Sequence, residues 1–349
     1  MNVVEELRLP GLEEALGRVE LALAEATAAE DRFLSEVAAH LASAGGKRLR
    51  PALLIAASQA AARDAADGHV ARRGAAVSDE AVRGGVAVEL VHLGSLYHDD
   101  VMDEATNRRG VASVNAKWGN LVAILAGDFL LARASEIAAS LGTEVAALLA
   151  RTISRLCEGE VGQLRYAFDV RRPAEAYRSS IAGKTASLMS TSARIGALVA
   201  GAPRPWVDAL TSYGEALGMA FQIWDDVRDV ICSDEALGKP AGHDMVEGTY
   251  TLPVILALGV NGAGDDLRSI LGAPLDAPAR EKARDLVISS GAIEVAVAEA
   301  RRWASKADAA LEPVRAAAGG SPGAAEWRLE RLRMLGGVGH WLLDQLDLP

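Results

Sequence analysis

Two stretches of this sequence repeat one pattern, and that pattern limits the fold more than any other feature. In the first, apolar residues recur at spacings of three and four: Val82, Val86, Leu90, Leu93, Tyr97 and Val101. This spacing predicts a helix with one buried face, and the helix runs into Asp99, Asp100 and Asp103. Residues four apart are neighbours on a helix, so Asp99 and Asp103 share a face. Two such close carboxylates repel each other unless a cation lies between them, and a divalent ion bound by carboxylate oxygens supplies that charge.

The second stretch has the same arrangement further along the chain. Its apolar stripe consists of Tyr213, Leu217, Phe221, Trp224, Val227 and Ile231, and it carries Asp225, Asp226 and Asp229. One Asp-Asp-x-x-Asp motif could be a solvated charge run, because carboxylates are ordinarily exposed. A second copy on the same kind of helix argues against that interpretation, since acids on a partly buried helix need partners. The pair predicts a site for several divalent cations.

Composition limits the class of protein. The chain has 349 residues, of which 50% are hydrophobic and only 4% aromatic, so its core should consist of Ala, Leu and Val in helices. A net charge of -11 argues against a nucleic-acid partner. Cys157 and Cys232 are too few for a disulfide framework. No secretory signal and no apolar run that could span a bilayer is found, so we expect a soluble, cytoplasmic protein without a transmembrane segment.

Other segments can be assigned more coarsely. Residues 11–44, 123–134 and 148–164 have the apolar periodicity of helices. Residues 61–84, 271–280 and 316–325 are expected to form loops, because they lack periodicity or are rich in Gly and Pro. Glu160 and Gln163 lie inside an apolar stripe, where they could reach a site or could serve as helix caps or core hydrogen-bond partners.

Basic residues supply what a phosphate would need. Lys47 and Arg50 are three apart and can converge on one anion, while Gly45 and Gly46 let the backbone approach it. Further basic groups are Arg108, Arg109, Lys184 and Lys239. The Gly-Lys-Thr at 183–185 is not a phosphate-binding P-loop, because the glycine that motif requires is Arg178 here. Magnesium on the acidic motifs would bridge to phosphate oxygens, so the set predicts a diphosphate substrate.

The rest of the pocket indicates what happens to the diphosphate. No Ser, Cys or His arrangement suggests a protein nucleophile, and the helices behind the acids are lined with small and apolar residues. A metal-bound diphosphate beside a dry apolar space suits carbocation chemistry. Magnesium stabilises the departing diphosphate, and the apolar walls protect the cation from water.

These motifs together resemble those of the trans-polyprenyl diphosphate synthases of the isoprenoid synthase fold. The matching segments are GGKRLRP at 45–51, HDDVMDEATNRRG at 98–110, GKT at 183–185, FQIWDDVRD at 221–229 and GKPAGHD at 238–244. The resemblance implies an all-α helical bundle around a central cavity. Because one site must gather residues from 47 to 244 and no linker separates them, we expect a single domain over residues 1–349. It also implies a homodimer.

The resemblance implies a prenyltransferase that condenses an allylic diphosphate with isopentenyl diphosphate, head to tail and in trans, with about three magnesium ions. The ligands of those ions would be Asp99, Asp103 and Asp225. The supporting catalytic residues would be Asp100, Asp226, Asp229, Lys184 and Lys239. Contacts to the allylic substrate would come from Arg108, Lys184, Thr185, Gln222 and Lys239, and contacts to isopentenyl diphosphate from Lys47, Arg50, His92 and Arg109.

Product length should depend on residues one and two turns before Asp99. Val91, Gly94 and Ser95 stand where farnesyl-making relatives typically have aromatic side chains. Small residues there predict a product longer than farnesyl diphosphate, of the long-chain type used for quinone side chains, with a geranylgeranyl or farnesylgeranyl product as the alternative. One departure from the family pattern is the segment Gly248 to Tyr250, where many relatives have a lysine before Thr-Leu-Pro.

Three other functions account for only part of the sequence. A class I terpene cyclase would share the fold and the first acidic motif, but it normally lacks a second Asp-Asp-x-x-Asp and needs no isopentenyl site. A non-catalytic subunit of a two-component synthase would be expected to have lost acidic residues, and both motifs are intact. A histidine-aspartate phosphohydrolase, suggested by His98 beside Asp99, would need further histidines at metal-binding spacing. The allylic starter and the pathway stay open.

Overall fold

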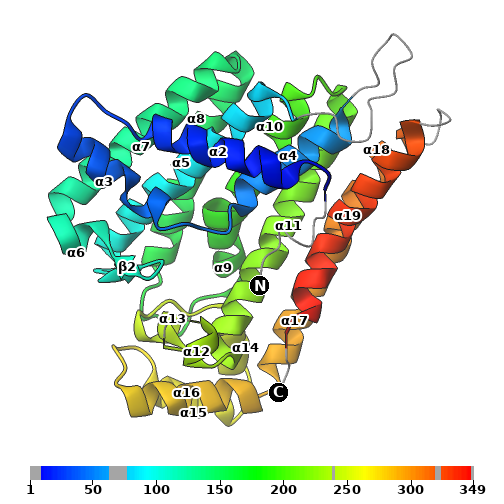
Figure 1. Cartoon of the computed structure of the whole chain (residues 1–349). Helices are drawn as coiled ribbons and strands as arrows, with labels where there is room; N and C mark the ends of the chain where they lie inside the picture. The colour runs from blue at the N-terminus through cyan, green and yellow to red at the C-terminus, as the bar shows by residue number, and fades with distance from the viewer. Residues whose placement is uncertain (1–8, 63–76, 238–239, 319–323, 347–349) are drawn as a thin grey trace. The chain divides into compact units, whose positions relative to one another are not determined.

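The computed structural model describes residues 9–62, 77–237, 240–318 and 324–346, and these residues are almost entirely α-helical (Figure 1). The exception is a pair of two-residue antiparallel strands, β1 (Asn107–Arg108) and β2 (Val111–Ala112). The all-α prediction is therefore confirmed. The chain forms two compact units.

Unit 1 comprises Met1–Ile153, Leu188–Gly214 and Ala310–Leu335. Its helices are α2 (Leu12–Ala26), α3 (Arg32–Ser43), α4 (Leu49–Ala61), α5 (Asp79–Met102), α6 (Val114–Trp118), α7 (Asn120–Ser140), α18 (Glu312–Ala318), most of α10 (Ser187–Val199), and parts of α8 (Thr143–Leu164), α11 (Arg204–Ile231) and α19 (Ala324–Asp344). Helix α5 packs against α2, α4 and α7. Its buried residues run from Ala81 to Asp100, and this makes α5 the core helix of the unit.

Small residues allow α5 to approach its neighbours closely. A Cβ atom on Gly94 would lie 3.1 Å from the carbonyl oxygen of Gly127 in α7. A Cβ on Gly127 would lie 2.3 Å from Nε2 of His98, whose ring contacts the carbonyl oxygen of Ile124 at 3.2 Å. The α5–α7 contact is therefore tight. A Cβ on Gly94 would press against the α7 backbone, and a Cβ on Gly127 would displace the His98 ring.

Unit 2 comprises Ser154–Ser187, Glu215–Ala309 and Gly336–Pro349. It contains the remaining parts of α8, α11 and α19, together with α9 (Ala174–Ile181), the π-helix η1 (Ala182–Ala186), α12 (Asp234–Leu237), α13 (His243–Val246), α14 (Leu252–Leu258), α15 (Ala263–Ile270), α16 (Ala277–Ser289) and most of α17 (Ala292–Ala310). Trp224, Tyr177 and Tyr250 are among its fully buried side chains. The C-terminal half of α11 brings the second acidic motif into this unit.

Most expected helices are confirmed, but the boundaries of all three expected loops were wrong. The loop expected at 316–325 is shorter than predicted, because α18 continues to Ala318 and α19 begins at Ala324. Helix α5 begins at Asp79, not after residue 84, because the Ser78 side chain accepts a hydrogen bond from the Ala81 N–H and caps the helix. Asp276 caps α16 in the same way, so the loop expected at 271–280 ends there. Residues 63–76 of the first expected loop and 319–323 of the third lie outside the described part. Among the described helices, none is both long and apolar enough to cross a membrane.

Candidate diphosphate-binding site

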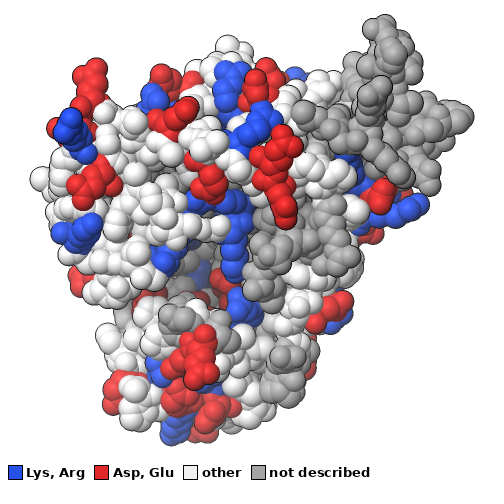
Figure 2. Space-filling view, in the orientation of Figure 1, with Lys and Arg blue, Asp and Glu red and all other residues white. Residues whose placement is uncertain are grey.

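Charged side chains of both signs are interspersed over the face shown in Figure 2, so the candidate sites are individual clusters of charged residues. The first is the acidic motif at the C-terminal end of α5. The Asp103 N–H donates to the Asp99 carbonyl oxygen at 2.8 Å, which keeps the two residues one helical turn apart. Asp99 is half-buried and Asp103 is exposed, so both can be reached by a ligand. The predicted pairing on one face therefore fits the helix geometry.

Asp100 points the other way and is fully buried. Its Oδ1 accepts a hydrogen bond from Nε of Arg108 at 2.7 Å, whereas its Oδ2 has no hydrogen-bond partner among the described residues. Burial raises the pKa of Asp100, and the guanidinium of Arg108 opposes that rise. Asp100 therefore orients Arg108, while its supporting role in catalysis stays a prediction.

The short hairpin β1–β2 directs two neighbouring arginines to different places. Arg109 and Gly110 both adopt the left-handed conformation, with φ of 54° and 78°, and form its tight turn. Arg108 returns to Asp100, while Nη1 of Arg109 donates to the carbonyl oxygen of Leu41 at 3.1 Å and to that of Gly45. The sequence analysis did not anticipate this hairpin, although Gly110 after three polar residues was a usable turn signal.

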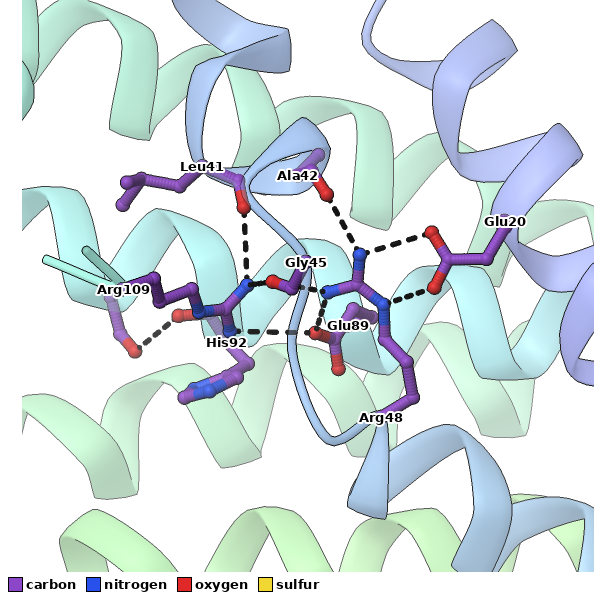
Figure 3. Close-up of polar contacts among 9 residues, drawn as sticks. Glu20, Leu41, Ala42, Gly45, Arg48, Glu89, His92 and Arg109 are labelled. Carbon is purple, nitrogen blue, oxygen red and sulfur yellow. Dashed lines mark hydrogen bonds and ion pairs between the residues drawn. The ribbon is translucent and has the colours of Figure 1, made fainter. Parts of the chain in front are cut away.

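The second charged site is the loop at 45–50, drawn in Figure 3 with its partners. A Cβ on Gly46 would lie 2.9 Å from Nη1 of both Arg48 and Arg109, so glycine is needed where the two guanidinium groups approach the backbone. Lys47 is exposed and Arg50 is half-buried, and the buried Nε of Arg50 has no hydrogen-bond partner among the described residues. Burial lowers the pKa of Arg50.

His92 lies on α5 beside this loop (Figure 3). Its pKa is held well below the usual value, first by burial and then by the positive charges of Arg50 and Arg109, with Arg108 and Arg48 adding to the effect. A neutral imidazole surrounded by arginines indicates a site with excess positive charge. Such a site favours a multiply charged anion, and the four residues predicted for isopentenyl diphosphate, Lys47, Arg50, His92 and Arg109, all belong to unit 1.

The acidic motif of α11 is held by a hydrogen-bonded chain within unit 2. Asp226 is 3% exposed; its Oδ2 accepts from the Tyr177 hydroxyl at 2.5 Å and its Oδ1 from Nε2 of Gln222 at 2.8 Å. The Thr185 hydroxyl donates to Oε1 of Gln222 at 2.6 Å. Burial raises the pKa of Asp226 well above its usual range, and the negative charges of Asp244 and Asp225 raise it further. Three predicted residues are thus connected, and Tyr177 is a partner that no sequence motif signalled.

The other two acids of this motif differ in exposure. Asp225 is exposed, so of the three it is the one most accessible to a ligand. Asp229 is 4% exposed; its Oδ2 accepts from the Asp244 N–H at 3.3 Å and its carbonyl oxygen accepts from the Gly242 N–H at 2.7 Å. Asp229 therefore fixes the segment that follows α12. The division between one metal-binding acid and two supporting acids stays a prediction, and these exposures are compatible with it.

Lys184 lies in the π-helix η1, which contacts α8 backbone to backbone. A Cβ on Gly159 would lie 2.6 Å from the Lys184 backbone nitrogen, and one on Gly183 would lie 2.7 Å from the Arg155 carbonyl oxygen. This contact brings Nζ of Lys184 to 2.5 Å from Oε2 of the buried Glu160. Glu160 thus serves as an ionic partner of a predicted site residue. Lys239 lies outside the described residues.

Arg172 is a buried cation that the sequence analysis missed. Its Nη1 donates to the Tyr250 carbonyl oxygen at 3.0 Å, and its Nε and Nη2 have no hydrogen-bond partner among the described residues. Burial lowers its pKa, and the nearby Tyr177 and Asp226 oppose that effect. Arg172 therefore provides positive charge beside the segment at 248–250, where the expected lysine is absent.

A cavity of 570 Å³ in unit 2 lies elsewhere on α8 and α9. Arg155, Arg165, Tyr166 and Ser179 are among its lining residues, and none of the predicted site residues lines it. Its position therefore argues against assigning the diphosphate to this cavity.

The three predicted chain-length residues have different surroundings. Val91 is fully buried, and Gly94 faces the α7 backbone, as described above. Ser95 is half-buried and donates to the His92 carbonyl oxygen at 2.8 Å. Gly94 thus lies in a tight helix contact, so Ser95 is the position where added bulk has a more open neighbourhood.

The donor set of both motifs fits magnesium. In the described part of the chain, no three His, Cys, Asp or Glu side chains converge as a complete metal site. Each motif instead offers a few accessible carboxylate oxygens, and magnesium characteristically keeps water and takes substrate phosphate oxygens as its remaining ligands.

Comparison with known proteins gives a consistent result. A sequence model of the family described as polyprenyl synthetase matches residues 31–286. The chain is 42% identical over 248 residues to a heptaprenyl diphosphate synthase component 2 of Geobacillus stearothermophilus, a match that covers 71% of this chain and 73% of the relative. It is 40% identical over 248 residues to a nonaprenyl diphosphate synthase of Mycobacterium tuberculosis, with 70% of each chain covered.

A solved structure resembles the whole chain. The polyprenyl synthase of Caulobacter crescentus, crystallised with calcium and isoprenyl diphosphate, superposes with a TM-score of 0.83 and 33% sequence identity. The match covers 96% of this chain and 97% of that one.

Proposed function

This chain belongs to the polyprenyl synthetase family, and we propose that it is a magnesium-dependent synthase of long-chain polyprenyl diphosphates. The enzymes of this family are prenyltransferases that use allylic and isopentenyl diphosphates. The observation that supports the proposal is that the chain offers two kinds of candidate phosphate site. One is the loop in unit 1 where Arg50 and Arg109 place positive charge around His92. The other kind is an acidic motif with accessible carboxylates, at Asp99 and Asp103 in unit 1 and at Asp225 in unit 2.

The two kinds of site suit two different diphosphates. The cationic loop would bind isopentenyl diphosphate directly, because guanidinium groups donate paired hydrogen bonds to phosphate oxygens. Asp99, Asp103 and Asp225 would hold the magnesium ions of the allylic diphosphate, three of them when substrate is bound. Bound magnesium would neutralise the departing diphosphate and so favour ionisation of the allylic bond.

Other residues of the chain orient these groups. Asp100 holds Arg108, and Tyr177 with Gln222 holds Asp226. Lys184, Thr185 and Lys239 would donate to the allylic diphosphate. Attack of the isopentenyl double bond on the allylic cation then forms the new carbon–carbon bond, and the released diphosphate would accept the proton that is lost.

We further propose a homodimer, a single functional domain and a cytoplasmic location. Leu121, Ile124 and Leu125 on α7 and Phe33 on α3 are exposed apolar side chains of unit 1, and burying such a patch against a second copy is favourable. The relative named as a component of a heptaprenyl synthase raises the alternative of a different partner. Light scattering of the purified chain, combined with an activity assay, would decide between a homodimer and a complex with a different protein. A monomer that gains activity only when a second protein is added would contradict the homodimer.

The role of the carboxylates can be tested by titrating magnesium. Asp103→Asn and Asp225→Asn should each raise the magnesium concentration needed for half-maximal activity and lower kcat, because each removes a charged ligand. Asp266→Asn is the matched control, since Asp265 and Asp266 form an exposed acidic pair on α15 outside both motifs. If the control and the motif variants respond alike to magnesium, the proposed metal sites are wrong.

A further inference from the structure

We propose that Arg48 and Glu89 are positioning residues that shape the isopentenyl diphosphate site, and that Arg48 itself does not bind the substrate. The inference rests on the proposed function, because it takes the loop at 45–50 as that site. Arg48 stands between Lys47 and Arg50 in the sequence, yet it differs from both in being 5% exposed.

The guanidinium of Arg48 uses its full hydrogen-bonding capacity within the protein (Figure 3). Nη1 donates to Oε1 of Glu89 at 2.8 Å and to the Gly45 carbonyl oxygen at 3.4 Å. Nη2 donates to the Ala42 carbonyl oxygen at 2.8 Å and to Oε2 of Glu20 at 3.0 Å, and Nε donates to Oε1 of Glu20. A guanidinium has five N–H donors, so none is left for a phosphate oxygen.

These bonds determine the course of the loop. Ala42 lies in the last turn of α3 and Gly45 in the loop that follows it. One planar group links both carbonyl oxygens to α2 through Glu20 and to α5 through Glu89. Arg48 has a φ of 45°, an unfavourable value for a non-glycine residue that the surrounding contacts must stabilise. Its neighbours then have fixed positions, with Lys47 exposed and Arg50 in the first turn of α4.

Glu89 connects the same arrangement to Arg109. It is 1% exposed, and its Oε1 lies 3.8 Å from Nη2 of Arg109 in addition to its bond with Arg48. Nη1 of Arg109 donates to backbone oxygens of Leu41 and Gly45, so these contacts and the charge of Glu89 together orient its remaining donors. Glu89 also favours the charged form of Arg50. A buried carboxylate that interacts with three arginines therefore holds like charges together without neutralising all of them.

A lysine could not replace Arg48, because a single ammonium group cannot reach four acceptor residues in one plane. Arg48→Lys should therefore raise the KM for isopentenyl diphosphate about tenfold, the factor that corresponds to about 1.4 kcal/mol. The KM for the allylic substrate and kcat should change less than about twofold, since they depend on other residues. Glu89→Gln keeps an oxygen acceptor for Arg48 and should have a smaller effect than Glu89→Ala.

The two positions should also be coupled. Because Arg48 and Glu89 share a direct contact, the double variant Arg48→Lys/Glu89→Gln should raise the KM for isopentenyl diphosphate by less than the product of the single effects. Arg18→Lys is the matched control, since Arg18 links α2 to the first turn of α5 through Asp79 and the Val77 carbonyl oxygen. Arg18→Lys should lower Tm without a selective change in the KM for isopentenyl diphosphate or in the KM for the allylic substrate.

The outcomes separate this inference from the proposed function. If Arg50→Met raises the KM for isopentenyl diphosphate but Arg48→Lys behaves like Arg18→Lys, the positioning role is refuted and the site stands. If Arg50→Met also leaves that KM unchanged, the assignment of the loop is wrong, and the inference falls with it. Should Arg48→Lys fail to fold, Glu89→Gln and Glu20→Gln carry the same test, and independent, multiplicative effects would overturn the proposal.

Discussion

The contact between α8 and η1 leads to a prediction about Gly159. In most helix interiors, alanine in place of glycine stabilises a protein by about 0.5–1 kcal/mol, because glycine loses more backbone entropy on folding. At Gly159 the added Cβ would stand 2.6 Å from the Lys184 nitrogen and 2.8 Å from the Ser180 carbonyl oxygen. Both are backbone atoms, so the two helices would have to separate.

We therefore expect Gly159→Ala to lower the free energy of unfolding by about 1–3 kcal/mol, the usual cost of overpacking a closely packed contact. Gly17→Ala is the matched control, because Gly17 lies in the interior of α2 and a Cβ added there would meet no neighbouring side chain or helix within 4 Å. That variant should gain about 0.5–1 kcal/mol, so the two should differ by roughly 1.5–4 kcal/mol.

Urea denaturation followed by circular dichroism would measure both changes. The Lys184–Glu160 ion pair should also be displaced in Gly159→Ala, with a higher KM for the allylic substrate. If Gly159→Ala is as stable as Gly17→Ala, the close approach of α8 and η1 is wrong, and so is the explanation for the position of Lys184.

Three other predictions concern single side chains. His92 has a lowered pKa, so the folded protein binds fewer protons than the unfolded chain and loses stability as pH falls through about 6.5. As pH falls from about 7.5 to about 5.5, the stability of His92→Gln should therefore increase relative to that of the wild type. A difference in Tm between the two proteins that stays constant with pH would contradict this. Ser95→Phe should shorten the product by chromatography; an unchanged length would place the end of the cavity elsewhere. Tyr177→Phe removes a hydrogen bond to a buried carboxylate and should cost about 1.5–3 kcal/mol in urea denaturation, whereas an unchanged midpoint would show that this bond contributes nothing.

Sequence reasoning succeeded where the information is local and periodic. The stripe that ends at Asp99 predicts α5, and the spacing of Asp99 and Asp103 predicts a shared face, because helix geometry fixes both. The family motifs then supplied the reaction class. The helix begins at Asp79, inside the expected loop, because the Ser78 cap stabilises its first turn despite the Gly-rich composition nearby.

The missed residues depend on contacts between distant segments. Arg48 and Glu89 are 41 positions apart and Tyr177 and Asp226 are 49 apart, so no local pattern connects them. Glu89 offered one usable signal, since a carboxylate inside an apolar stripe needs a partner. Its partner could not be named from the sequence, because Lys47, Arg48 and Arg50 are all cations within four positions. The conformation of the turn at Gly45 and Gly46 determines which of them points toward Glu89.

Product analysis of the wild-type enzyme tests the central claim most directly. The purified chain would be incubated with farnesyl diphosphate, labelled isopentenyl diphosphate and magnesium, and the products separated by chain length. We expect polyprenyl diphosphates longer than geranylgeranyl, with one diphosphate released for each isopentenyl unit added and no product when magnesium is chelated. A product that stops at geranylgeranyl would contradict the long-chain claim, and release of phosphate without carbon–carbon bond formation would contradict the proposed function altogether.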